Sequence, residues 1–451
     1  MVNTPEDPTT IGVSSILSAL SYALDLTEGH PRGHSARSCL IGMALGRVVG
    51  LPPQDQQDLF YALLMKDAGC SSNADRVFKV FGGDDQAAKR GAWETDWRTL
   101  RGKASYALKF AEPGGSIGAR IGKLLALATG GRAIGRSIYQ IRCERGAEIA
   151  QAIGFSRATA QAIRSMDEHW DGGGYPEGLK GEAIPLLARI VGIAQVAEIF
   201  AEQDGPQMAL AVVRERRGRW FDPDLAKAFG DVASDAGLWA RVASSDVDRE
   251  VAAVEPESPQ VMRFSIDDER LDRIAVAFAW VVDAKSPFTY HHSERVSDIA
   301  TAMAAYIGLS KAECVRVKRA GLLHDIGKLG VPNRILDKPD RLTEREWDVV
   351  RLHPYYSYQI LERVPVFGEF AFDASAHHER MDGRGYYRNL KGEQLSQCAR
   401  ILATADKFDA LSADRPYRSG MPLERVFSIL SEDAGRDLCP DCVAVAKEVA
   451  V

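Results

Sequence analysis

The sequence predicts an all-α protein made of two tandem, related helical halves, and three observations support this prediction. Apolar residues in most periodic stretches recur at the three- and four-residue steps of a helix. No segment shows the sustained alternation of apolar and polar residues, bounded by hairpin turns, that a sheet requires. The 451 residues suffice for two or three domains, and part of the first half is repeated in the second.

The clearest helices are in the second half. Apolar residues at helical spacing occur over 271–282 and again over 296–307, where Gly308 is a plausible C-cap. Residues 310–313 and 343–346 each have the Ser/Thr-x-x-Glu pattern of a capping box, so a helix should begin at each. These signals together predict four helices between 271 and about 350.

The internal repeat is clearest where residues 171–182 (DGGGYPEGLKGE) parallel residues 382–393 (DGRGYYRNLKGE) at an offset of 211. Nearer the N-terminus, His34 parallels His292 at an offset of 258. The first copy therefore carries 47 additional residues, which we place between about 71 and 140. We expect a surface insertion or lid there, with helical pieces such as 117–127.

Histidines are concentrated in the second half, where six of the nine lie between residues 291 and 378. Five of them, with two aspartates, form a candidate metal site. Its members are His292, His324, Asp325, His353, His377, His378 and Asp406. Seven nitrogen and oxygen donors are too many for one ion, but they suit two ions that share a carboxylate. An imidazole-rich set favours iron or manganese over magnesium or calcium.

The strings HSERV, LLHDIGK, HHERMDGRGYY and ARILATADKFDALSADRPYR, in this order over about 267–445, resemble the HD-GYP branch of the HD-domain phosphohydrolases. The resemblance implies HD-type helical domains and a metal-dependent phosphodiesterase that acts on a cyclic dinucleotide, with cyclic di-GMP as first candidate. The naming triplet Gly-Tyr-Pro is here Gly385-Tyr386-Tyr387, and an intact copy, residues 174–176, lies in the first half.

The resemblance also implies how the ligands are shared between two divalent ions. The first ion would take His292, His324, Asp325 and Asp406. The second would take the other oxygen of Asp325 with His353, His377 and His378. A hydroxide bridging the two ions would be the nucleophile. Some relatives use a glutamate for a third metal where this chain has Phe288, so we expect two ions.

Lys328 is the candidate for a second catalytic role, because it lies four residues after His324 and could contact a phosphate oxygen beside Asp325. Weaker candidates for substrate contact surround the triplet and follow Asp406. They are Arg384, Tyr386, Tyr387, Arg415 and Tyr417. Asp409 and Arg400 are expected to support the site rather than to act on substrate.

The first half has lost most of these ligands. At the positions of His324, His353, His377, His378 and Asp406 it has Lys66, Arg142, Met166, Asp167 and Gln195. Only His34 and Asp67 remain, and a lysine and an arginine would repel a divalent cation. We therefore predict a degenerate HD-type domain over 1–243, regulatory or dimerising, a polar linker over 244–262 and a catalytic domain over 263–451.

Composition limits the remaining possibilities. The formal net charge of −6 argues against binding of nucleic acid or an anionic membrane surface, and no apolar run is long enough to span a membrane. Seven scattered cysteines fit a reducing cytoplasm. Two alternatives stay open: a phosphohydrolase of the same type that acts on another nucleotide or phosphoester, and a non-catalytic module that senses a ligand. A homodimer or a regulatory partner could bind through the first domain.

Overall fold

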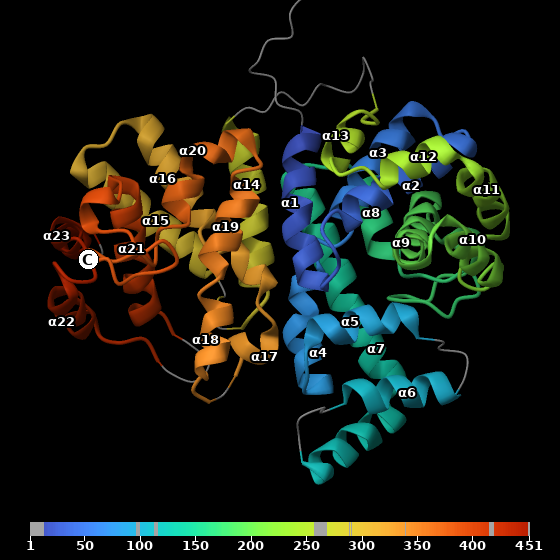
Figure 1. Cartoon of the computed structure of the whole chain (residues 1–451), viewed down its shortest axis with the longest axis horizontal. Coiled ribbons are helices and arrows are strands. Elements are labelled where there is room, and N and C mark those ends of the chain that lie inside the picture. The colour runs from blue at the N-terminus through green and yellow to red at the C-terminus, as the bar shows by residue number, and fades with distance from the viewer. Residues whose placement is uncertain are drawn as a thin grey trace, which may run out of the picture. The chain divides into compact units, whose positions relative to one another are not determined.

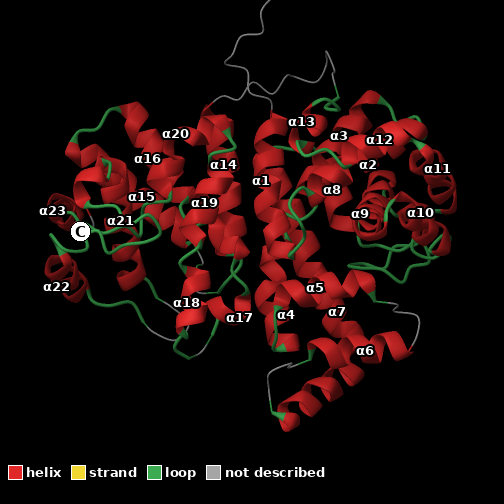
Figure 2. Cartoon of the chain, in the orientation of Figure 1, coloured by secondary structure: helices red, strands yellow, loops and turns green. Residues whose placement is uncertain are grey.

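The chain forms two compact helical units, Met1–Arg270 and Leu271–Val451. The computed structural model describes residues 13–95, 100–111, 116–256, 268–287, 289, 291–338, 340–414 and 419–449. Over these ranges the regular structure is helical without strands, which confirms the predicted all-α class (Figure 2). No described helix has the length and apolar composition needed to cross a membrane.

The first unit is built around α2, which packs against α1, α3, α9, α11 and α13 (Figure 1). Its buried side chains, such as Leu40, Ile41 and Leu45, form the centre of the apolar core. Outside the insertion and the segment after residue 243, the helices of this unit are α1 (Val13–Glu28), α2 (His34–Val48), α3 (Pro53–Met65), α8 (Arg157–Ser165), η2 (Gly181–Ala183), α9 (Leu186–Asp204), α10 (Pro206–Glu215), α11 (Pro223–Ser234) and α12 (Ala236–Val242).

Most of the described residues of the predicted insertion are helical. The insertion comprises η1 (Cys70–Asn73), α4 (Ala74–Phe81), α5 (Asp85–Glu94), α6 (Leu100–Phe110) and the first part of α7 (Ile117–Ile153). The sequence analysis named 117–127 as one example of a helical piece. α7 begins at the same residue but is 37 residues long, and it packs against α8. Glycines at 130, 131 and 135 weaken the helical pattern in the sequence, but they do not interrupt the helix.

The predicted linker over 244–262 differs from the structure in its first part. Residues there form a short helix, α13 (Val247–Ala252), which begins at the N-cap Asp246 and packs against α1 and α2. The Ser18 hydroxyl donates to Asp248 at 2.6 Å, and the Tyr61 hydroxyl donates to Glu255 at 3.1 Å. Burial of Val247 and Val251 holds this segment on the first unit.

The second unit is built around α15, which packs against α16, α21 and α23. Its helices are α14 (Asp268–Asp283), α15 (His292–Ile307), α16 (Lys311–Leu323), η3 (Ile326–Gly330), α17 (Asn333–Leu336), α18 (Glu344–Val350), α19 (His353–Leu361), α20 (Pro365–Ala374), η4 (Gly392–Gln394), α21 (Gln397–Ser412), α22 (Leu423–Asp433) and α23 (Pro440–Val449). The predicted capping boxes begin α16 and α18, and Gly308 ends α15 with a φ of 86°.

The sequence repeat extends to the packing inside each unit. The hydroxyl of Ser35 donates to Asp25 at 2.9 Å, and the hydroxyl of Ser293 donates to Asp283 at 2.7 Å. A Cβ on Gly69 would lie 1.9 Å from the Arg142 carbonyl oxygen, and one on Gly327 would lie 2.0 Å from that of His353. Gly69 and Gly327 correspond at the offset of 258, and Arg142 and His353 correspond at the offset of 211. The same close backbone contact therefore recurs in each unit.

Candidate metal centre in the second unit

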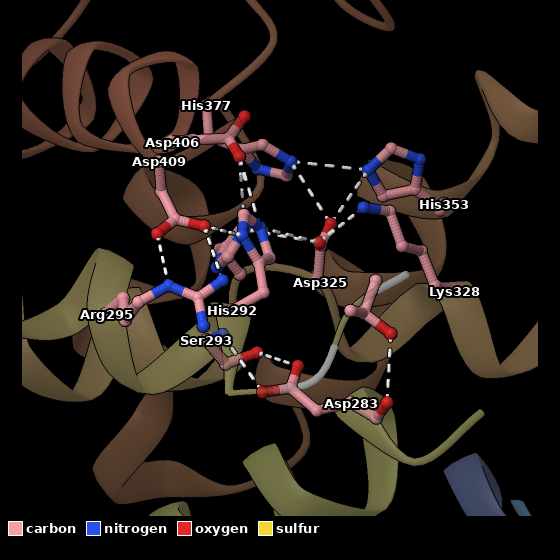
Figure 3. Close-up of polar contacts among 12 residues, drawn as sticks. Asp283, His292, Ser293, Arg295, Asp325, Lys328, His353, His377, Asp406 and Asp409 are labelled. Carbon is pink, nitrogen blue, oxygen red and sulfur yellow. Dashed lines mark hydrogen bonds and ion pairs between the residues drawn. The ribbon is translucent and has the colours of Figure 1, made fainter. Parts of the chain in front are cut away.

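The seven predicted ligands come together, although they are spread over 115 positions of the sequence. Five helices, or the residues that directly follow them, contribute the donors (Figure 3). His292 begins α15, His324 ends α16, His353 begins α19, His377 and His378 follow α20, and Asp406 lies within α21. Five of the seven are buried, whereas 14% of the Asp406 side chain and 27% of the His378 side chain are exposed.

Asp325 lies at the middle of the group and directs its two oxygens to opposite sides (Figure 3). Its Oδ2 lies 3.3 Å from Nε2 of His324 and 3.6 Å from Nε2 of His292. Its Oδ1 lies 3.3 Å from Nε2 of His353 and 3.6 Å from Nε2 of His377. A carboxylate placed in this way could be shared by two divalent ions, one on each side.

The donors form two triads, one on each side of Asp325. His292, His324 and Asp406 form the first triad, and the second consists of three histidines. Those three are His353, His377 and His378. Within each triad the donor atoms lie no more than 4.8 Å apart. The two triads have the membership expected for two ligand groups, and their occupation by two ions stays a prediction.

Hydrogen bonds orient four of the five histidines. Nδ1 of His324 donates to the Gly321 carbonyl at 2.7 Å, and Nδ1 of His353 donates to the Val350 carbonyl at 2.7 Å. His377 bonds in the same way to the carbonyl of Ala374. These acceptors lie in the last turns of α16, α18 and α20, where carbonyls lack helical partners. The bonds fix the tautomer, so Nε2 of each ring faces the centre.

His292 is held differently, because it begins a helix. Its Nδ1 lies 2.7 Å from Oδ2 of Asp409, and Arg295 binds the same carboxylate at 2.5 Å (Figure 3). Asp409 follows Asp406 by less than one turn of α21, so one helix supplies both a ligand and a support. Asp409 was expected to be a supporting residue, whereas the contribution of Arg295 was not anticipated.

The charge of the group suits cations. Burial opposes the ionisation of Asp325 and Asp406, but nearby cationic groups outweigh it. These groups are histidines and Lys328 for Asp325, and histidines for Asp406. The pKa of each carboxyl therefore lies well below its usual range. Burial lowers the pKa of His353 to about 4, which leaves its imidazole neutral and able to act as a ligand at pH 7. The C-termini of α16, α18 and α20 add partial negative charge around the centre.

Two buried atoms in this centre have no hydrogen-bond partner within the described part of the chain. They are Nε2 of His324 and Oδ1 of Asp325. An unsatisfied buried donor or acceptor is costly, so both atoms require another partner. Divalent ions would provide it, and the mixed imidazole and carboxylate donors fit a borderline transition metal.

The predicted substrate-binding residues lie at different distances from this centre. The Lys328 ammonium pairs with Asp325, and the Tyr386 ring lies 4.9 Å from the His378 ring. Tyr387 instead packs against Tyr355, with ring centroids 5.4 Å apart. Arg384 is exposed. Arg415, Tyr417 and Phe288 lie outside the described residues.

The sequence analysis missed Glu379, which shapes the turn beside the centre. This residue is 2% exposed and accepts hydrogen bonds from the backbone amides of Arg388 and Leu390 at 2.7 and 2.9 Å. Glu168 accepts from the amides of residues 177–179 in the first unit. The sequence held one signal of this role. A glutamate directly follows the paired histidines, and the first half has a glutamate, Glu168, at the same place in the repeat.

In the first unit, cationic side chains surround the carboxylate that corresponds to Asp325. Lys66 pairs with Asp67, and its Nζ lies 2.9 Å from Nε2 of His34. Nη2 of Arg142 lies 3.7 Å from Oδ1 of Asp67 and 3.5 Å from Oδ2 of Asp167. The first unit thus neutralises Asp67 with its own side chains, at positions where the second unit has His324 and His353.

A further group of potential donors in the first unit does not favour a metal. Glu28, Asp67 and Cys70 lie close together, but Lys89 pairs with Glu28 at 2.9 Å. Burial raises the pKa of the Cys70 thiol well above its usual range. To bind a metal, this thiol would have to lose its proton beside two carboxylates, which is unfavourable. Lys89 and Arg142 already provide the positive charge there.

Comparisons with known proteins agree with this geometry. The HD domain family model matches residues 124–225 and 278–440, and so parts of both units. The 3'3'-cGAMP-specific phosphodiesterase 3 of Vibrio cholerae is 40% identical over 439 residues, which are 97% of this chain and 95% of that protein. A cyclic di-GMP phosphodiesterase of Thermotoga maritima is 38% identical over 157 residues, 34% of this chain and 43% of that protein.

A solved structure supports the same relationship over the full length. The crystal structure of a cyclic GMP-AMP specific phosphodiesterase of V. cholerae covers 98% of this chain and 98% of its own, with a TM-score of 0.66 and 36% identity. Family match, overall similarity and the grouping of the motif residues therefore agree. The chain belongs to the HD-GYP branch of the HD-domain family and is a metal-dependent phosphohydrolase.

Proposed function

We propose that the second unit hydrolyses a phosphodiester bond of a cyclic dinucleotide, with 3'3'-cGAMP as first candidate. The observation that carries the proposal is the position of Asp325, which directs one oxygen to each of the two triads. Similarity over 97% of the chain to a 3'3'-cGAMP-specific phosphodiesterase supports this substrate. It moves 3'3'-cGAMP ahead of cyclic di-GMP, which the sequence analysis placed first.

Cyclic di-GMP remains a second candidate for a specific reason. Cyclic di-GMP phosphodiesterases of Thermotoga maritima and Xanthomonas campestris are each 38% identical to this chain, over 34% and 39% of its length. These shorter matches support the reaction class, whereas the relative that extends over both units supports the choice of substrate. A direct competition between the two dinucleotides therefore distinguishes them.

The donor set fits two divalent ions, iron or manganese, shared through Asp325. Such ions supply an activated water and neutralise charge on the phosphate. The protein holds the five imidazoles and two carboxylates in fixed positions, and four of the imidazoles are locked by bonds at Nδ1. This preorganisation means that little rearrangement is needed when the substrate binds.

Two side chains beside the centre are suited to bind the dinucleotide. The Lys328 ammonium can exchange its contact with Asp325 for a phosphate oxygen and stabilise the charge that develops in the transition state. The Tyr386 ring, which lies against His378, offers a face on which a base can stack. Burial raises the pKa of Tyr386, so its hydroxyl stays protonated and can donate a hydrogen bond.

The test uses the full chain loaded anaerobically with Fe²⁺ or Mn²⁺ and given equal amounts of 3'3'-cGAMP and cyclic di-GMP. We expect faster loss of 3'3'-cGAMP and the appearance of linear dinucleotide or mononucleotides. The double variant His324→Ala/Asp325→Ala should be inactive. His291→Ala is the matched control, because His291 neighbours His292 but is half exposed and contacts Glu294. Turnover of neither dinucleotide by the loaded chain would refute the proposal.

A further inference from the structure

The first unit contains a cavity of about 1380 Å³ for which the proposed catalytic function gives no role. The insertion helices α4, α6 and α7 form one wall, and α9, α10 and residues 216–222 form another. Arg142, Met166, Asp167 and Gln195 all line it. These residues stand where the second unit has metal ligands, so the cavity lies over the degenerate centre.

Two arginines of the cavity wall have buried guanidinium nitrogens without a hydrogen-bond partner in the described residues. These nitrogens are Nε and Nη2 of Arg142 and Nε of Arg189. The Arg142 side chain is 6% exposed, and its Nη2 reaches carboxylates only at 3.5 Å or more. A buried donor without an acceptor is unfavourable, so both guanidinium groups favour an acceptor supplied from the cavity.

Three acidic residues of the wall have partners of their own, whereas Asp167 lies 3.5 Å from Nη2 of Arg142. Glu28 pairs with Lys89, and Glu168 accepts from the backbone amides of residues 177–179. Asp222 accepts from the two amides that begin α11 as well as from Arg189. The negative charge of these three carboxylates is therefore compensated locally, and Asp167 is the acidic group that would share Arg142 with a bound anion.

Aromatic rings complete the cavity. Tyr139 and Tyr175 stack with ring centroids 5.0 Å apart and an angle of 7° between their planes. The indole of Trp170 lies under the guanidinium of Arg189, 5.6 Å from its centroid. Guanidinium groups bind phosphate in a planar, two-point manner, and aromatic faces stack on nucleobases. The second unit offers Tyr386 at the position of Tyr175.

From this arrangement we propose that the cavity of the first unit is a second nucleotide site. The phosphate of the ligand lies against Arg142 and Arg189, and its base lies among the aromatic rings beside Tyr139 and Tyr175. The site binds without hydrolysing, because five of the seven metal-ligand positions are replaced there, by Lys66, Arg142, Met166, Asp167 and Gln195. It is independent of the proposed phosphodiesterase activity, since its residues belong to the first unit alone.

The test measures binding to the full-length His324→Ala/Asp325→Ala chain, so that hydrolysis cannot interfere. Isothermal titration with 3'3'-cGAMP, GMP and inorganic phosphate gives stoichiometry and affinity for each probe. We expect one of the two nucleotides to bind once per chain in the first unit, with at least tenfold higher affinity than phosphate.

Added substitutions assign the binding to this cavity. Ala107→Trp fills it from α6 and should weaken nucleotide binding at least tenfold. Ala126→Trp on α7, which is exposed and does not line the cavity, should leave binding unchanged. Arg189→Met should also weaken binding tenfold or more, and Asp222 keeps its amide donors in that variant.

Three results would overturn the proposal. One is that neither nucleotide binds at millimolar concentration. Another is that binding is insensitive to Ala107→Trp, which would assign it to the second unit. The third concerns a further probe, a long-chain carboxylate, titrated in the same way. If it binds to saturation and the nucleotides do not, the cavity takes an apolar ligand instead. Loss of catalysis in the second unit affects none of these outcomes.

Discussion

Replacing Lys66 with methionine should destabilise the first unit by about 3 kcal/mol, because it leaves a buried carboxylate without its nearest cation. The Lys66 side chain is fully buried, its Nζ lies 2.9 Å from Nε2 of His34, and it pairs with Asp67, whose side chain is 3% exposed. Methionine retains most of the side-chain volume, so the loss of charge dominates the change.

The magnitude follows from what remains around Asp67. Removing one partner of a buried ion pair costs about 3–5 kcal/mol. Here Arg142 stays 3.7 Å from Asp67, and the Ser35 hydroxyl stays 3.4 Å away, so we expect the lower end of that range. The double variant Lys66→Met/Asp67→Asn removes both charges and should lose less than the single variant.

The effect should also depend on pH. Burial opposes ionisation of Asp67, but Lys66, Arg142 and His34 outweigh it and hold the pKa of its carboxyl well below the ordinary value. A carboxylate with a lowered folded-state pKa contributes stability above its unfolded pKa, and this contribution is lost as the pH falls through the folded value. The difference between the native chain and Lys66→Met should therefore be full near pH 7 and shrink below about pH 4.

Cysteine protection in urea provides a readout that is specific to each unit. Cys39, Cys70 and Cys143 are buried in the first unit, whereas Cys398 and Cys442 are buried in the second. In the Lys66→Met variant the first three thiols should become reactive at a urea concentration lower by about 1 M, and the second set should not change. Lys79→Met is the matched control, because that lysine is 62% exposed and pairs with Asp75 on the surface. Equal midpoints for Lys66→Met and Lys79→Met would refute the reasoning.

Two further predictions concern the candidate metal centre. Asp409→Asn weakens the hydrogen bond that orients His292, so chelator competition should show metal affinity lower by roughly 10- to 100-fold, and an unchanged affinity would contradict this support. Gly327→Ala places a Cβ 2.0 Å from the His353 carbonyl oxygen. This clash should lower the free energy of unfolding by about 1–3 kcal/mol, and it should also lower activity because it displaces His353. Gly368→Ala, whose nearest atom would lie 3.9 Å away, is its control, and similar melting of the two variants would argue against a tight contact.

The sequence predicted the fold class and the grouping of the site because each depends on local signals. Capping boxes and apolar periodicity located α14, α15, α16 and α18, and the ordered motifs identified which histidines to group. α7 was underestimated, because its glycines reduce helix propensity while packing against α8 supports the helix. α13 was read as linker, since two buried valines are too weak a pattern in a polar stretch.

Other features depend on three-dimensional placement and left little trace in the sequence. The carbonyls of Gly321, Val350 and Ala374 orient three histidines through backbone atoms, which any residue type supplies. Lys66 and Arg142 could be read from the sequence only as lost ligands, whereas the structure brings both against Asp67. The cavity of the first unit likewise depends on tertiary structure, because the insertion and helices α9 and α10 contribute different parts of its lining.

The measurement that tests the central claim most directly is the metal content of the full chain after anaerobic loading, with Asp325→Ala beside it. If Asp325 bridges two triads, the native chain should retain about two ions and the variant close to none, because both sites lose a ligand. His291→Ala should retain two. One ion or none in the native chain, or two ions in Asp325→Ala, would contradict a binuclear centre built on this carboxylate.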